Sequence, residues 1–370
     1  MHQYSTHVGL DVHKDSIEIA VARPDEEVRS LGRVGYDEAG LVARLRRIAP
    51  AEQLRCWYEA GPTGFGLQRA LARRGIACQV VAPSLIPRAW GERIKTDRRD
   101  AVKLARLGRS GDLATIHIPE PAHEYARDLI RTRARAVQDL HRQRQRMLKL
   151  LLRWEMRPPS TLRSTWTHAY QRWLDGLRFA DGAQQQVFEH LQMAIAEAEH
   201  RRERLDAATR VLATRAPWHQ LITALSALHG VAELSAAILV GELAPFSRFA
   251  DAHKCMAAAC LVPREHSSGA SIRRGPITRT GSPWARYALV EAAHHYRLCR
   301  RTHESKRVRA IRAGLPAVLA SHARDAQARL ARLAQRLYAH GKAPQLIVVA
   351  VARELAGAVW KMGVLIERAD

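Results

Sequence analysis

The order of strand-like and helix-like segments in the first 111 residues is the feature that most constrains the fold of this chain. Residues 7–13 (HVGLDVH), 16–22 (SIEIAVA) and 27–36 (EVRSLGRVGY) alternate with the two-residue period of strands, and short turns separate them. Later segments with helical and strand-like patterns follow in turn, namely helical 37–49, strand 54–60, helical 64–75, strand 76–83 and helical 98–111. This order predicts three antiparallel strands, followed by two more that are added in parallel through helices.

Such an order is that of a ribonuclease-H-like fold, in which the first and fourth strands are neighbours. Charge-rich helical stretches fill residues 120–215 and are broken at Pro158 and Pro159, which predicts an antiparallel helical hairpin. This hairpin has two readings, a solvated spacer or a dimerising arm that also grips phosphates. Residues 216–370 are mainly helical. We therefore expect an α/β domain at 1–119, a long helical insertion at 120–215 and a helical domain at 216–370.

Four carboxylates stand at positions that this fold would bring together. Asp11 lies in the middle of the first strand, Glu59 ends the fourth, and Asp97 and Asp100 are three residues apart at a helix start. Residues three apart share a helix face, so both aspartates can point at one site. Four carboxylates in one place repel each other unless cations intervene. The set predicts a pair of Mg²⁺ ions, with Mn²⁺ as the other metal that such oxygen ligands accept.

Each of these acids also has a structural explanation when it is taken alone. Asp97 could be a helix N-cap, Asp100 a partner of the helix dipole, and Glu59 an exposed strand end. Asp11 is harder to explain in this way, because a lone carboxylate inside an apolar strand is costly without a partner. Glu18, in the second strand, is expected to face solvent.

The charge balance indicates a polyanionic partner. Lys and Arg total 59 against 36 Asp and Glu, and 51 of the 59 are arginine, whose planar fork binds phosphate in a bidentate manner. Residues 1–60 oppose this trend with 8 basic and 10 acidic side chains, whereas residues 263–312 carry 12 basic and 3 acidic ones. The five cysteines form no CxxC pair, and no apolar run is long enough to span a bilayer. We therefore expect a cytoplasmic protein with reduced thiols.

Several motifs in one order resemble the DEDD-type transposases of bacterial insertion sequences, recombinases that an element-encoded bridge RNA directs. They are HVGLDVHKDSIEIAV, CWYEAGPTGFGLQRAL, IKTDRRDAVKLARL, ALHGVAELSAAILVGEL and FADAHKCMAAACLVPREHSSGASIRRGPITRTGSPWARYALVEAA. The resemblance covers nearly the whole chain. It implies a RuvC-like domain, a coiled-coil insertion and a C-terminal transposase domain with a nucleophilic serine. Within that last domain, residues 229–239 (HGVAELSAAIL) resemble a helix-hairpin-helix element, with a plain buried helix pair as the alternative. Asp11, Glu59, Asp97 and Asp100 fall on the family's D-E-D-D positions.

The resemblance further implies a serine nucleophile in a PxxxxSG segment. That serine is Ser268 here, with its neighbour Ser267 as second choice. The surrounding cations suit a phosphodiester and its transition-state charge, and they are Arg264, Arg273, Arg274 and Arg279. The implied partners are DNA (element ends and target) and a guide RNA, bound by a homodimer that assembles to a tetramer. The implied location is the bacterial cytoplasm, at the nucleoid.

Two other functions fit the same residues. A Holliday-junction-resolvase-like nuclease would use the four acids with water as the nucleophile, and would keep cutting DNA without Ser268. A non-catalytic RNA-binding or structural protein would show no metal-dependent cleavage at all.

Overall fold

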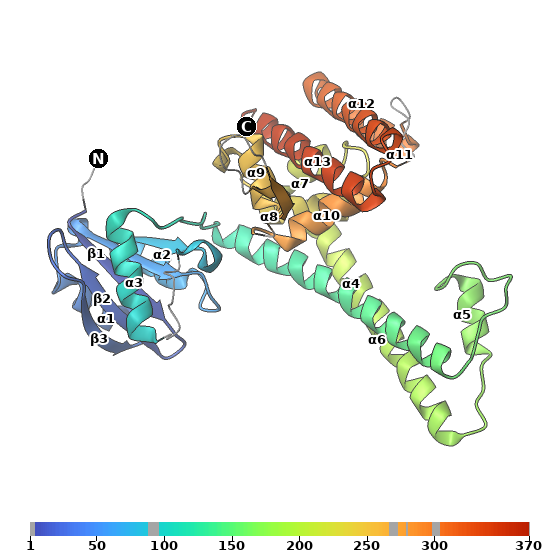
Figure 1. The fold of residues 1–370 in the computed structure, drawn as a ribbon, viewed down its shortest axis with the longest axis horizontal. Helices are drawn as coiled ribbons and strands as arrows, with labels where there is room; N and C mark the ends of the chain where they lie inside the picture. Colours follow the sequence, from blue (N-terminus) through green and yellow to red (C-terminus); the bar gives the residue numbers. More distant parts are fainter. Residues whose placement is uncertain (1–3, 88–95, 266–272, 279, 298–303, 370) are drawn as a thin grey trace. The chain divides into compact units, whose positions relative to one another are not determined.

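A computed structural model describes residues 4–87, 96–265, 273–278, 280–297 and 304–369. The chain divides into two compact units, Met1–Pro119 and Glu120–Asp370 (Figure 1). The first unit is a sheet with helices, and the second consists mainly of helices.

The first unit is built on a mixed sheet of five strands over its described residues. The strands are β1 (Thr6–Val12), β2 (Ser16–Ala22), β3 (Arg29–Gly35), β4 (Leu54–Glu59) and β5 (Ala77–Val81). Their order across the sheet is β3-β2-β1-β4-β5, with antiparallel β1/β2 and β2/β3 pairs and parallel β1/β4 and β4/β5 pairs. The predicted arrangement is confirmed, including the adjacent first and fourth strands.

Helices cover both faces of this sheet. Helices α1 (Glu38–Arg46) and α2 (Gly66–Arg73) share an apolar core with the strand residues Leu10 and Tyr58. Helix α3 (Asp97–Ser110) packs on the opposite face of the sheet (Figure 1). The alternate strand residues on that face, such as Ala20 and Trp57, form small apolar clusters with it.

Helix α3 lies unusually close to β1 because two glycines remove side chains from the contact. A Cβ on Gly9 would stand 2.0 Å from the carbonyl oxygen of Ala101 in α3. A Cβ on Gly108 of α3 would stand 2.4 Å from Nε1 of Trp57 in β4. The helix is therefore held against the sheet by direct backbone contact at one point and by an indole at the other.

The second unit begins with an antiparallel helical hairpin, as predicted. Helices α4 (Pro121–Arg153) and α6 (Gly182–Ala213) pack along each other, and a short helix that the sequence pattern did not indicate, α5 (His168–Asp175), lies between them in the chain. Arg133 Nε contacts Asp206 Oδ1 at 2.6 Å, and Arg144 Nη2 contacts Glu199 Oε1 at 2.5 Å. Charged pairs thus supplement the apolar contacts of the hairpin.

The rest of the second unit is a helical bundle around α13. Its elements are α7 (Trp218–Leu225), α8 (Glu233–Leu243), α9 (Ala252–Ala258), β6 (Pro263–Glu265), β7 (Arg274–Ile277), α10 (Pro283–His294), α11 (Lys306–Ala313), α12 (Ala317–Ala339) and α13 (Pro344–Glu367). Every residue of α8 from Ala236 to Leu243 is buried, because this helix is surrounded by its neighbours. Within the described ranges, no helix combines the length and apolar character that crossing a bilayer requires.

A buried ion pair ties the hairpin to this bundle. Glu242 of α8 has a side chain only 2% exposed, and its two oxygens accept hydrogen bonds from Arg131 of α4 at 2.6 and 2.9 Å. One of these oxygens also accepts a bond of 2.8 Å from the hydroxyl of Ser282, the N-cap of α10. A single carboxylate therefore joins α4, α8 and α10.

Candidate functional site

A row of charged side chains crosses the sheet of the first unit on the face that α3 covers. Asp11 of β1 pairs with Glu18 of β2, and Glu18 pairs with Arg33 of β3. On the other side of β1, Leu10 pairs with Tyr58 of β4, so Asp11 and Glu59 are the next residues on the two strands. Directly paired residues in a sheet point to the same face. The strand register therefore aligns Arg33, Glu18, Asp11 and Glu59 in this order.

Glu18 is a buried member of this row, and the expectation that it faces solvent is wrong. It is 7% exposed, accepts a hydrogen bond of 3.3 Å from the Ser30 hydroxyl, and lies 3.5 Å from Nε of Arg33. The hairpin register places it opposite Asp11, where α3 excludes water. The reasoning that singled out Asp11, an acid inside an apolar strand, applied equally to Glu18.

The start of α3 contributes the second acidic group. Thr96 is the N-cap, because its hydroxyl accepts the backbone N–H of Arg99 at 3.4 Å. The Asp97 carboxylate is thus not used as the cap and instead accepts a hydrogen bond of 2.7 Å from Arg33 Nη2. Arg33 consequently contacts both Glu18 in the sheet and Asp97 in the helix.

One imidazole connects the two aspartates. Nε2 of His13 lies 3.1 Å from Oδ2 of Asp11 and 3.5 Å from Oδ1 of Asp97. Each of these three side chains offers one ligand atom, and the three atoms lie within 4.8 Å of one another. Carboxylate oxygens suit Mg²⁺ or Mn²⁺, and imidazole is a common ligand of transition metals. The donor set therefore fits a divalent cation.

The raised pKa of Asp11 also fits a site for a cation. Burial raises the pKa of Asp11, the hydrogen bond and charge of His13 oppose this rise, and the negative charges of Asp100 and Asp97 add to it. The net effect is a pKa above the usual value. A bound cation stabilises the charged carboxylate and would reverse this shift.

The structure brings three of the four predicted acids into electrostatic reach of one another. Asp100 lies one turn after Asp97 in α3, half-buried, and its charge acts on Asp11. Glu59 is exposed at the end of β4. Strand register aligns it with Asp11, but no ion pair or hydrogen bond joins it to another residue in the described parts of the chain. His13 and Arg33 also belong to the site, since both contact Asp97, although no sequence pattern singled them out.

Two short strands flank, along the chain, the segment predicted to carry the nucleophile. Strands β6 and β7 pair in antiparallel register, with Pro263 opposite Ile277. Arg264 and Arg273 are exposed, and Arg274 begins β7. Three of the predicted residues lie outside the described parts, namely Ser267, Ser268 and Arg279. Their roles stay predictions.

Comparison with known proteins places this arrangement among the transposases. Residues 8–155 match the family model of the IS110 DEDD transposases, and residues 222–309 match that of the IS116/IS110/IS902 transposase family. The chain is 38% identical over 361 residues, 95% of its own length and 87% of the relative's, to a Sinorhizobium fredii protein named as the transposase y4qE. It is 32% identical over 243 residues, 65% of its length and 70% of the relative's, to the transposase for insertion sequence element IS1533 of Leptospira borgpetersenii.

Proposed function

Because the chain belongs to the IS110 family of insertion-sequence transposases, we propose that its own activity is to cut and rejoin DNA at a site in the first unit. This site is the carboxylate cluster formed by Asp11, Glu18, Glu59, Asp97 and Asp100. The observation that carries this proposal is the convergence of Asp11 and Asp97 on His13, on the sheet face that α3 covers. Acids brought this close in a half-buried site are typical of phosphoryl-transfer centres that use divalent cations.

The proposed metal ligands are Asp11, Asp97, Asp100 and Glu59, and the imidazole of His13 is a further donor beside two of them. Mg²⁺ or Mn²⁺ bound there would supply charge neutralisation at the scissile phosphate. Glu18 and Arg33 do not act as ligands in this proposal. They hold the metal ligands in place, since Arg33 fixes the Asp97 carboxylate and Glu18 fixes Arg33.

We also propose that the first unit is a ribonuclease-H-like domain of the RuvC type. Its strand order, with antiparallel β1–β3 and parallel β4 and β5, supports this assignment. We further propose that the second unit has two functional parts, a dimerising coiled-coil arm at 120–215 and a transposase domain at 216–370. The antiparallel pairing of α4 and α6 within the chain supports the coiled-coil character of this arm.

The nucleophile that we propose is the hydroxyl of Ser268, with Ser267 as the alternative. In this reaction the serine hydroxyl gives up its proton and its oxygen attacks a DNA phosphorus, the bond from phosphorus to the leaving strand breaks, and the leaving oxygen takes up a proton. A phosphoserine link then keeps the bond energy for rejoining. Arg264, Arg273, Arg274 and Arg279 would stabilise the charge of the transition state, and a guide RNA would select the site. These details rest on the sequence motifs.

DNA cleavage by single variants tests the carboxylate cluster. Asp11→Asn removes the half-buried ligand and should abolish metal-dependent cutting of labelled element-end DNA. Asp25→Asn is the matched control. It removes one charge from an exposed turn of the same unit, and Asn tolerates the φ of 58° there. Cutting that survives in Asp11→Asn, or that is lost equally in Asp25→Asn, would contradict the proposal.

The serine and the RNA need separate tests. Ser268→Ala should eliminate the covalent protein–DNA adduct that denaturing gels detect. Cutting that persists in this variant without any adduct would instead favour a nuclease that uses water.

Sequencing of the RNA that co-purifies with the chain should find one discrete species encoded beside the gene.

A further inference from the structure

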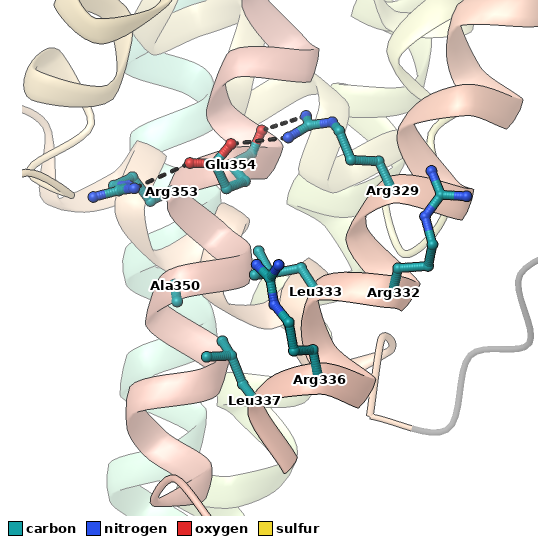
Figure 2. A pocket seen from close by; sticks show the side chains of 8 residues that line it. All are labelled: Arg329, Arg332, Leu333, Arg336, Leu337, Ala350, Arg353 and Glu354. Carbon is teal, nitrogen blue, oxygen red and sulfur yellow. Dashed lines mark hydrogen bonds and ion pairs between the residues drawn. The ribbon is translucent and has the colours of Figure 1, made fainter. Parts of the chain in front are cut away.

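A groove lined with arginine runs between α12 and α13, far along the chain from the carboxylate cluster. Its volume is about 610 Å³, and four arginines line it together with a single acid, Glu354. Figure 2 shows Arg329, Arg332 and Arg336 on α12, with Arg353 and Glu354 on α13. Both helices lie outside the segments that match the family models, which end at residue 309.

Two of the four arginines are already paired. Glu354 accepts hydrogen bonds from Arg329 Nη1 at 2.8 Å and from Arg353 Nη2 at 3.1 Å (Figure 2). Burial alone would raise the pKa of Glu354, but the hydrogen bonds and charges of these two arginines outweigh it and hold this pKa below its usual value. The carboxylate is therefore ionised, and its hydrogen bonds hold the guanidinium groups of Arg329 and Arg353 in place.

The other two arginines have unsatisfied charge. Arg332 and Arg336 are exposed, and over the described ranges neither guanidinium has a hydrogen bond or an ion pair. Four cations that share one anion repel each other, and an incoming anion relieves this repulsion. The groove thus carries a net positive charge and suits a partner with several negative charges.

The spacing of the arginines indicates what kind of anion fits. Arg329, Arg332 and Arg336 stand at i, i+3 and i+7 on one helix face and span about 10 Å along the axis, at 1.5 Å per residue. Successive phosphates of one strand in duplex DNA advance about 3.4 Å along its axis, so this span matches about three such steps. Between the cations, Leu333 and Leu337 form a partly buried apolar floor on which sugars can pack.

We propose that this groove binds the phosphodiester backbone of a nucleic-acid strand, with Arg332 and Arg336 on the phosphates. Arg329 and Arg353 border the strand in the orientation that Glu354 imposes. The contact is independent of base sequence, because arginines that grip phosphates position a strand without reading it. The proposal takes from the proposed function only that the partner is a nucleic acid.

Salt-dependent binding tests the groove without any cleavage. Fluorescence anisotropy would measure binding of the full chain, in the presence of a chelator, to three labelled probes. The probes share one base sequence and are duplex DNA, single-stranded DNA and RNA. Arg332→Gln and Arg336→Gln each remove one phosphate contact. The control is Arg324→Gln, which removes the same charge from an exposed position of α12 that does not line the groove.

Each groove variant should lower the slope of log affinity against log salt by about 0.9 on duplex, or about 0.7 on a single strand, and Arg324→Gln should not. This corresponds to roughly five- to tenfold weaker binding near 0.1 M salt. The probe with the larger change identifies the strand that occupies the groove. Unchanged slopes on all three probes would refute the proposal and favour an acidic protein segment as the partner of the groove. An equal fall of the slope in Arg324→Gln would also refute it, because binding would then depend on the overall positive charge of the chain and not on the groove.

The two proposals fail in different ways. A chain that binds through the groove but never cuts DNA contradicts the proposed function alone. Groove variants that bind normally in a chain that does cut contradict the groove alone. No binding of any probe by the unsubstituted chain would overturn both.

Discussion

Replacing Arg131 by methionine should loosen the junction between the hairpin and the helical bundle. The change leaves the Glu242 carboxylate, 2% exposed, without the two hydrogen bonds of 2.6 and 2.9 Å that now neutralise it. Breaking a buried pair in this way costs about 3–5 kcal/mol. We expect the lower end, about 3 kcal/mol, because the Ser282 hydroxyl stays bonded to the carboxylate and water reaches the position of Arg131, 34% exposed.

Hydrogen exchange measured by mass spectrometry reports this loss locally, which matters because a chain of two units does not unfold in one step. A loss of about 3 kcal/mol lowers amide protection in peptides from Glu233–Leu243 roughly a hundredfold. The matched control is Arg142→Met on the same helix, which breaks an exposed pair with Asp139 and should cost less than about 1 kcal/mol. Protection of α8 that falls less than about threefold in Arg131→Met, or equally in the control, would refute the reasoning.

Three further substitutions probe other contacts. Gly9→Ala puts a methyl group 2.0 Å from the Ala101 carbonyl oxygen, so the thermal transition of the first unit should show a loss of about 1–3 kcal/mol, whereas Gly35→Ala, with nothing within 4 Å, should be neutral. Burial lowers the pKa of His123 below 6.5, so its contribution to stability falls as pH drops below 6.5. His123→Gln should flatten the melting temperature between about pH 7 and 5, and an unchanged profile would contradict this. Burial raises the pKa of Asp11 above 3.8, so ionisation costs stability as pH rises through the folded pKa. Asp11→Asn in chelator should therefore melt higher than the native chain at pH 7, with a difference that vanishes near pH 4; equal melting at pH 7 would count against it.

The backbone of the first unit could be predicted from the sequence because its strands alternate clearly and its turns are short. The adjacency of the first and fourth strands followed from element order, and with it the alignment of Asp11 with Glu59. The burial of Glu18 could not be predicted from the alternation of apolar and polar residues, since the residues on both faces of β2 are nearly all buried. Only the pairing register, which the turn between β1 and β2 fixes, places Glu18 opposite Asp11.

Side-chain contacts between distant segments were harder to predict. Arg33 stands on β3, 64 residues before the carboxylate of Asp97 to which it donates. No local spacing rule connects two such positions, because their meeting depends on how closely α3 packs on the sheet. The same holds for the α12 and α13 groove, where Arg329 and Glu354 are 25 residues apart and meet through helix packing.

Arg33 gives the carboxylate cluster an internal counterion. Its guanidinium already compensates part of the charge of Glu18 and Asp97, so the acids do not depend on a metal to remain close to one another. A divalent cation that binds Asp97 must then compete with Arg33, and its apparent affinity is the difference between two electrostatic interactions. In the proposed metal site, Arg33 would therefore keep the acids together without metal and would lower the affinity for the metal, and the length and charge of the side chain at position 33 would set both effects.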